Sequence, residues 1–198
     1  MAKWISFIVL AVLVVGGLSC VGSYNTLVSL DQQVQAQWGQ VQNVYQRRLD
    51  LVPNLVETVK GAASFEKDTF TAVSEARAKA SQTMVEPSKV VNDPNAFQQF
   101  QRSQDALSAA LSRLSVVVER YPELKATQNF RDLQAQLEGT ENRIAVERKR
   151  FNETAQAFNT KRDSFPTVLV AGFFGSRFNE KPYFRAQEGA ETAPKVKF

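Results

Sequence analysis

The segment from Arg47 to Val56, RRLDLVPNLV, decides the fold because it places a proline inside a long helical pattern. Apolar side chains recur every seven residues on both sides of Pro53, as in Trp38, Tyr45, Val52 and Val59. This heptad spacing is typical of helices that pack against one another. Proline lacks a backbone N–H and clashes with the preceding turn. We therefore predict that the first helical region kinks or restarts at Pro53, with Asp50 capping the new start.

Prolines and turn residues divide the remaining chain into two further helical regions. Residues 83–95 contain Pro87 and Pro94 and read as a loop, with Asp93 and Pro94 starting the third helix. We predict a second break at Pro122 and a fourth helix over residues 123–165, ended by Pro166. The apolar positions of this fourth helix lie seven residues apart: Phe130, Leu137, Ile144, Phe151, Phe158 and Phe165.

No alternating pattern of the kind found in β-strands extends beyond a few residues, so we predict an all-α fold. A long hairpin bent at Pro53 and Pro122 would give an antiparallel up-and-down four-helix bundle. The alternative is a longer rod of two kinked helices.

The composition excludes several kinds of functional site. The 198 residues include no histidine and one cysteine, which removes the commonest metal ligand, the commonest general base and any intrachain disulfide. The net charge of +4 is small, and its charges of both signs are interleaved along the helices. A nucleic-acid-binding protein more often concentrates positive charge on one face. We predict no cofactor, no metal and no nucleic-acid partner.

An uncharged, mostly apolar stretch of 19 residues runs from Trp4 to Gly22. As a helix it would span about 28 Å, close to the hydrocarbon thickness of a bilayer. We interpret it as an uncleaved signal anchor, which divides the chain into an anchor (1–23), a helical body (24–166) and a C-terminal tail (167–198). Lys3 precedes the stretch and no basic residue follows it before Arg47. The positive-inside rule then predicts a single-pass protein of the cell membrane with its body on the extracytoplasmic side.

Cys20 leaves a second interpretation of the N-terminus open. A lipoprotein signal ends at a cysteine that becomes lipidated, and Ser19 suits the position before it. Leu18 lies one place late for that motif, and Gly17 occupies the usual leucine position. Cys20 is therefore a candidate lipidation site.

The tail contains an apolar patch, residues 168–175, followed by Phe178, Tyr183 and Phe184. One interpretation is that these aromatic residues pack over one end of the helical body. The other is that they form an exposed surface for a partner or a membrane.

Short blocks of distinctive residues occur in order along nearly the whole chain: Tyr24–Val28, Trp38, Arg47–Val56, Thr58–Gly61, Glu66, Ala76–Ala78, Tyr121–Ala126, Glu141–Ala145, Arg148, Phe151–Asn152, Phe158–Asn159 and Phe165–Pro166. In these blocks the sequence resembles the LemA family. The resemblance implies a membrane-anchored helical bundle of the bacterial envelope, with no established biochemical activity.

Polar residues also stand at or beside the apolar positions of the helices. A charge in such a place is costly unless it is paired, so we predict a buried polar network that fixes the register of the helices. The alternative is a polar pocket that binds a ligand or catalyses a reaction. The residues concerned are Arg48, Glu66, Arg77, Glu141, Arg148, Asn152 and Asn159.

Two classes of function follow from these patterns. The first is a non-enzymatic interaction or scaffold protein, anchored in the bilayer and bound to another membrane or envelope protein. The second is an enzyme or small-ligand carrier that uses carboxylates inside the body. In that second case Glu66 and Glu141 would be its general acid and base. We favour the first, because the sequence contains no nucleophile paired with a base.

Overall fold

The computed structural model describes residues 2–60, 67–84 and 87–185, and these residues confirm the all-α fold class. No strand occurs within those ranges. The helices are α1 (Ala2–Lys60), α2 (Lys67–Gln82), α3 (Pro87–Asn92), α4 (Pro94–Val118), α5 (Pro122–Lys125), α6 (Gln128–Asp163) and α7 (Thr167–Phe174), with a 3-10 helix, η1 (Gly175–Phe178).

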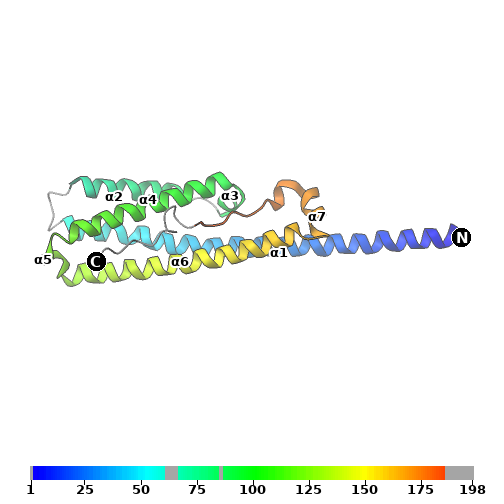
Figure 1. The fold of residues 1–198 in the computed structure, drawn as a ribbon, viewed down its shortest axis with the longest axis horizontal. Coiled ribbons are helices and arrows are strands. Elements are labelled where there is room, and N and C mark those ends of the chain that lie inside the picture. The colour runs from blue at the N-terminus through cyan, green and yellow to red at the C-terminus, as the bar shows by residue number, and fades with distance from the viewer. Residues whose placement is uncertain (1, 61–66, 85–86, 186–198) are drawn as a thin grey trace, which may run out of the picture.

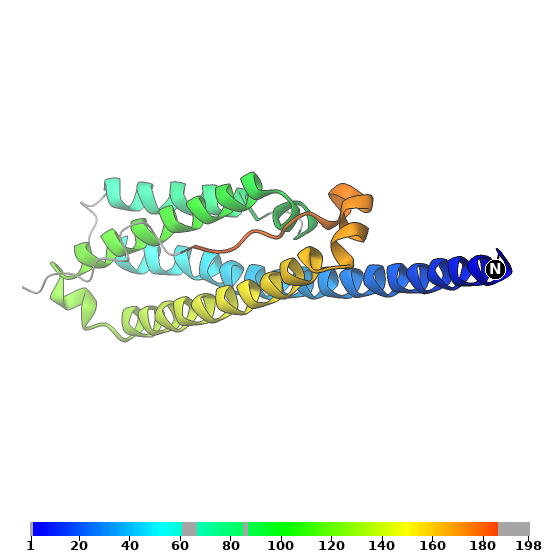
Figure 2. The ribbon, with the colours of Figure 1, turned by 45° about the vertical axis from the view of Figure 1, so that its right-hand side comes forward.

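The long helices lie side by side along the length of the molecule (Figures 1 and 2). The most extensive helix pair is α1 with α6, and the next is α2 with α4. Helix α1 extends well past the other helices toward the N-terminus (Figure 1). This projecting part is the apolar stretch predicted from the sequence.

Among the residues that the structure describes, the core consists of two apolar clusters that follow one another along the molecule. The first surrounds Trp38, whose ring contacts those of Phe97, Phe100, Phe151 and Phe184. The second joins α1, α2, α4 and α6 through residues that include Val52, Val59, Val73, Leu114 and Phe130. Because the heptad positions of α1 contribute to both clusters, this single helix spans the whole core.

The predicted restart of the helix at Pro53 is wrong, since α1 is helical from Ala2 to Lys60. A proline at position 53 leaves the carbonyl of residue 49, four positions earlier, without its helical donor. In this fold Arg77 on α2 takes that place, since its Nε donates a hydrogen bond to the Leu49 carbonyl oxygen at 2.8 Å. Pro53 itself is exposed, which leaves its ring room on the solvent side of the helix.

The other breaks lie near their predicted places, with two differences. Asp93 caps α4 by accepting a hydrogen bond from the Asn95 N–H, and Pro94 starts that helix, as predicted. The chain leaves the helical conformation between Val118 and Pro122. The predicted loop contains the short helix α3. The predicted fourth helix is interrupted before Gln128, where Thr127 caps α6 through the Phe130 N–H.

The apolar spacing of α6 ends one heptad earlier than predicted. Phe151 and Phe158 are fully buried, whereas Phe165 is 81% exposed. The reason is that α6 stops at Asp163, so Phe165 belongs to the turn before α7 rather than to the helix.

Within the part of the chain that the structure describes, no contact buries the N-terminal part of α1. Among residues 2–60, 67–84 and 87–185, α1 alone is long and apolar enough to cross a membrane, and its most apolar window is wholly exposed. The burial of α1 begins at Ser23 and Leu27. The apolar stretch continues into the body within one uninterrupted helix.

Candidate functional site

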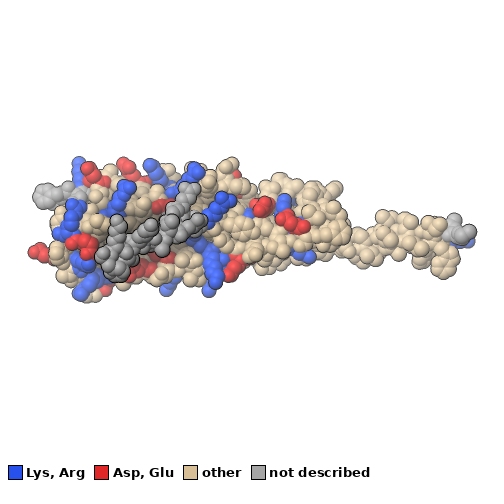
Figure 3. Space-filling model, viewed as in Figure 1, with Lys and Arg blue, Asp and Glu red and all other residues tan. Residues whose placement is uncertain are grey.

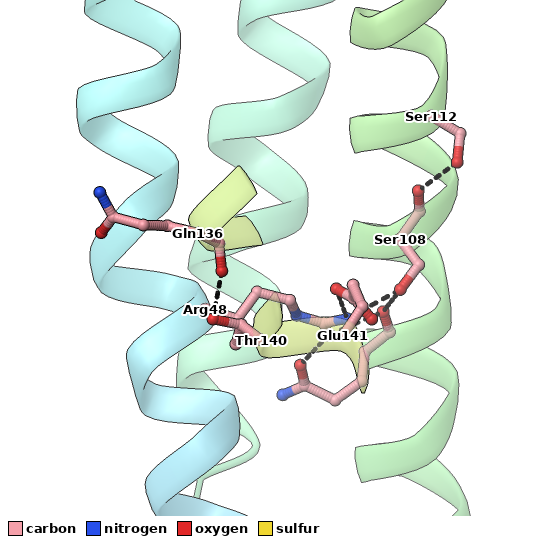
Figure 4. A network of polar contacts seen from close by, with 7 residues as sticks. Arg48, Ser108, Ser112, Gln136, Thr140 and Glu141 are labelled. Atoms are coloured by element: carbon pink, nitrogen blue, oxygen red, sulfur yellow. Dashed lines mark hydrogen bonds and ion pairs between the residues drawn. The ribbon is translucent and has the colours of Figure 1, made fainter. Parts of the chain in front are cut away.

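The polar residues named from the sequence separate into three places, and the first surrounds Arg48. This side chain is 1% exposed in the middle of the body. Its Nη1 donates to Ser108 Oγ at 2.8 Å and to Glu141 Oε1 at 3.0 Å, and its Nη2 donates to Gln104 Oε1 at 2.6 Å. Figure 4 shows Arg48 of α1, Ser108 of α4 and Glu141 of α6 lying close together. The guanidinium therefore ties three helices together.

Gln104 extends the Arg48 contacts to a fourth helix. It is buried, and its backbone carbonyl also accepts from Arg48 Nη2 at 3.2 Å. The Gln104 side-chain amide donates to the Ala80 carbonyl at the end of α2, at 3.3 Å. A buried charge that is hydrogen-bonded on several sides fixes the relative positions of the elements that supply its partners.

Tyr45 lies one turn before Arg48 on α1 and forms part of the same environment. The Arg48 guanidinium carbon lies 5.0 Å from the centre of the Tyr45 ring, in cation–π contact. Burial raises the pKa of the Tyr45 hydroxyl, and the charges of Arg148 and Arg48 oppose that shift. The hydroxyl is therefore neutral at physiological pH and contributes no charge to the site.

Glu141 differs from Arg48 in its access to solvent. Its side chain is 41% exposed, against 2% for that of Arg48. It lines an open groove of about 530 Å³ between α4 and α6, together with Ser108, Ser112, Glu138 and Asn142. The carboxylate is thus paired on its inner side and reachable from the groove. This arrangement holds an arginine in place, and it also offers hydrogen-bonding groups to a small polar molecule.

The second place is the Leu49 carbonyl, where Arg77 binds. Arg77 contacts the backbone of α1 rather than the Arg48 cluster, so it is not a member of the same network. Glu66 lies outside the described residues. The structure therefore does not test whether Glu66 and Glu141 pair as acid and base, as the enzyme alternative requires. The described residues contain no group of three or more His, Cys, Asp or Glu side chains placed to hold a metal ion.

The third place is the C-terminal segment 179–185, which runs along α6. Asn159 donates to the Lys181 carbonyl at 2.9 Å and accepts from the Lys181 N–H at 2.8 Å. Asn152 makes the same pair of bonds with Phe184, at 3.0 Å and 2.9 Å. Each amide side chain thereby satisfies both backbone groups of one residue, as a neighbouring strand would.

The spacing of these two asparagines matches the spacing of their partners. Seven residues of helix rise about 10.5 Å. Three residues of extended chain cover about 10 Å, so Lys181 and Phe184 meet Asn159 and Asn152 in register. Arg148 fastens the end of the segment, because its Nη2 donates to the Arg185 carbonyl at 2.8 Å and its guanidinium lies over the Phe184 ring. These three side chains bind the tail and do not join Arg48.

Sequence reasoning missed Lys181, a fully buried lysine within the tail. Its Nζ forms an ion pair with Asp31 at 2.5 Å, contacts Asn92 Oδ1 and lies 4.7 Å from the centre of the Phe158 ring. Lys181 thus links α1, α3 and α6. A single lysine next to Asn179 and Glu180 carries no signal of burial. The isolated Asp31, in an uncharged part of the chain, could have suggested a distant cation.

Comparison with known proteins adds relatives that share most of this chain. This chain is 26% identical over 184 residues to magnetosome protein MamQ 2 of Paramagnetospirillum magneticum. The aligned region covers 85% of this chain and 67% of that protein. It is also 26% identical to magnetosome protein MamQ of Magnetospirillum gryphiswaldense, over 80% of this chain and 65% of the relative. Protein LemA of Metamycoplasma hominis is 25% identical, over 76% of this chain and 64% of the relative.

The matched region thus spans about two thirds of the length of each relative. The family model of the LemA family matches residues 37–198, which include the Arg48 cluster, Arg77 and the C-terminal segment. This chain belongs to the LemA family.

Proposed function

We propose that this protein is a membrane-anchored, non-enzymatic scaffold of the bacterial envelope, whose body is an antiparallel four-helix bundle. The observation that carries the proposal is the continuity of α1. One helix contains both the exposed apolar stretch and the central wall of the body, with no linker between them. A body joined in this way is held at a set distance and orientation from the bilayer, which suits a protein that positions a partner.

The internal polar contacts support a structural use of the buried charges. Arg48 binds groups on two neighbouring helices, Arg77 binds the backbone beside Pro53, and the α6 asparagines bind the tail. Each of these polar side chains therefore has a partner that explains its presence in the fold. The MamQ relatives are named for the magnetosome, and neither name states a reaction.

We place the anchor in the cell membrane as a single pass, with the body on the extracytoplasmic side. The exposed apolar window of α1 supports the span, and Lys3 before it supports the orientation. The partner is then a membrane or envelope protein.

A second candidate function rests on the groove beside Glu141. The partly exposed carboxylate and the serines of α4 could bind a small polar ligand there. Under this alternative the protein would be a ligand carrier or an enzyme, and the groove would be needed for its activity.

In vivo photo-crosslinking separates the two functions. A photoreactive residue is placed at exposed positions of the body, such as Val116 and Val146, in intact cells. We expect a discrete adduct that persists when Ser112→Trp fills the groove and when Glu141→Gln removes its charge. In a further variant, serines replace leucines of the span and release the body from the bilayer. This variant should lose the adduct. Loss of the adduct in the two groove variants, with the fold intact, would instead favour the ligand-binding function.

A further inference from the structure

Helix α7 has an exposed apolar surface, and its contact with water is energetically unfavourable. One side of α7 is buried through Thr167, Val170 and Ala171. Its other side exposes Val168, Leu169, Phe173 and Phe174, which we call the α7 apolar face; Phe173 is 85% exposed and Leu169 is 64% exposed. A surface helix of a soluble protein normally carries polar residues on its outer side. Here no charged residue occurs between Asp163 and Arg177, so both sides of the helix are apolar.

The α7 apolar face lies beside the end of the membrane span. An open, almost entirely apolar groove of about 550 Å³ separates α7 from α1, and Cys20, Val21 and Tyr24 form its α1 wall. The α7 wall consists of Leu169, Val170, Phe173 and Phe174. In Figures 1 and 2, α7 lies where α1 leaves the other helices. The exposed apolar surface of the span therefore continues onto α7 without a polar interruption.

Charge follows the same division along the molecule. In Figure 3 the Lys, Arg, Asp and Glu side chains cover the body, whereas the projecting part of α1 is free of them up to its N-terminal end. Arg177 is exposed, and its guanidinium lies 5.7 Å from the ring centres of Tyr24 and of Phe178. Tyrosine and arginine are typical of the boundary between lipid and water, where an apolar body and a polar tip face different surroundings.

We propose that α7 is a second membrane-contacting element, lying in the interfacial region of the leaflet next to the body, with its apolar face against lipid acyl chains. This rests on the proposed membrane anchor, since the bilayer must surround residues 4–22. From Cys20 to Tyr24 the helix rises about 6 Å, which falls within the depth of about 5–10 Å that interfacial helices reach. Lipid is favoured over a second copy of the chain because the face is continuous with the lipid-exposed span.

An interfacial α7 changes how the anchor works. A single helix can tilt and rotate in a bilayer, whereas two points of contact restrict both motions. The tail segment that follows η1 is bound to α6 through Asn152 and Asn159, and Lys181 joins it to α1. The lipid contact of α7 would therefore set the orientation of the whole body relative to the membrane.

Spin-label accessibility tests the proposal with the full-length chain in phosphatidylcholine nanodiscs. In a Cys20→Ser background, one nitroxide is attached at Phe173→Cys or Leu169→Cys. Leu13→Cys in the span is the lipid control, and Val116→Cys on α4 is a matched exposed apolar position on the body. Collisions with oxygen report lipid, and collisions with a water-soluble nickel chelate report water. We expect positions 173 and 169 to favour oxygen, as position 13 does, and position 116 to favour nickel.

Three other results would overturn the inference. If positions 173 and 169 behave like position 116 while position 13 favours oxygen, the anchor stands and α7 lies in water. If position 13 also favours nickel, the membrane anchor itself fails, and the proposed function fails with it. If positions 173 and 169 exclude both reagents and their spectra show spin–spin broadening, a second copy of the chain covers the face instead of lipid.

Discussion

Arg77 Nε donates a 2.8 Å hydrogen bond to the carbonyl oxygen of Leu49, the group that Pro53 leaves without its helical donor. One side chain of α2 thus supplies what the proline removes from α1. The same contact joins the two helices. It explains how α1 remains one helix through a residue that normally ends or kinks helices.

This relationship gives a testable coupling between two distant residues. Arg77→Met strands the Leu49 carbonyl, and we expect it to lower the free energy of unfolding by about 1–3 kcal/mol. In a Pro53→Ala background the alanine N–H can bind that carbonyl, so the same Arg77→Met change should cost clearly less. Urea denaturation of the four proteins in one detergent measures the difference.

Lys79→Met is the matched control, because it removes one positive charge from an exposed position of the same helix. It should change the unfolding free energy by no more than about 0.5 kcal/mol. Equal costs of Arg77→Met with and without Pro53 would show that the arginine does not compensate the proline.

The Arg48 cluster should respond unequally to loss of its two charges. Arg48→Met removes the charged group that binds three side chains and leaves the buried Gln104 side chain without its donor, so we expect the loss of several hydrogen bonds to lower the free energy of unfolding by about 3–5 kcal/mol. Glu141→Ala leaves Arg48 its bonds to Ser108 and Gln104, and Glu141 is partly solvated. Its cost should be smaller, about 1–3 kcal/mol. The double change Arg48→Met, Glu141→Leu should be milder than the sum of the two single changes.

Thermal or urea unfolding of these variants checks the order of the effects. A Glu141→Ala protein with unaltered stability and lost crosslinking to its partner would argue that Glu141 acts on a ligand in the groove.

How much of this the sequence could predict depends on where each residue's partner lies. The heptads of α1, α4 and α6 predicted the apolar core, because periodicity records burial within a single helix. The restart at Pro53 was wrongly predicted, because the hydrogen bond that replaces the missing donor comes from Arg77. Arg77 lies 28 residues from Leu49, so no local pattern indicates the contact. From their heptad spacing, Asn152 and Asn159 were predicted to belong to a buried polar network between helices. Their partner is the extended segment 179–185, and no helical periodicity in the sequence indicates where such a segment packs.

The tail shows the same limit for charged residues. Lys181 is buried because Asp31, Asn92 and Phe158 meet around it. Those three residues lie on three different helices, so no local pattern marks the site. Glu66, in contrast, was singled out by its heptad position, and it lies outside the described residues.

The hydrogen bonds of Asn152 and Asn159 should hold the C-terminal segment 179–185 against α6, each at its own partner residue. Asn159→Leu removes both bonds to Lys181, a loss of about 1–3 kcal/mol for two hydrogen bonds. We expect the amide of Lys181 to exchange its hydrogen about tenfold faster or more, since about 1.4 kcal/mol corresponds to a factor of ten. Hydrogen exchange read by nuclear magnetic resonance measures this.

Asn152→Leu should do the same at Phe184, while Asn142→Leu, at an exposed position of the same helix, should leave both amides unchanged. If exchange at Lys181 and Phe184 is indifferent to all three changes, other contacts hold the segment.

The raised pKa of Tyr45 predicts that the folded protein loses stability at high pH. Burial raises its pKa in the folded protein above the value of about 10 in the unfolded chain. Its stabilising contribution is therefore complete below about pH 10 and is lost as the pH rises through the folded pKa, because the unfolded state releases its proton first. Tyr45→Phe should flatten the alkaline part of the stability curve. Urea unfolding at a series of alkaline pH values tests this, and an unchanged slope in Tyr45→Phe would refute it.

We expect α1 to be one rigid helix from its exposed apolar stretch into the core. The most direct test measures the distance between nitroxides at Leu18 and Gln40 in the Cys20→Ser protein, by double electron–electron resonance in nanodiscs. Both positions are exposed, and they lie on either side of the point where burial begins. A continuous helix predicts one narrow distribution centred near about 33 Å, from a rise of about 1.5 Å per residue. A broad distribution, or one centred at clearly shorter distances, would reveal a hinge between anchor and body and contradict the account.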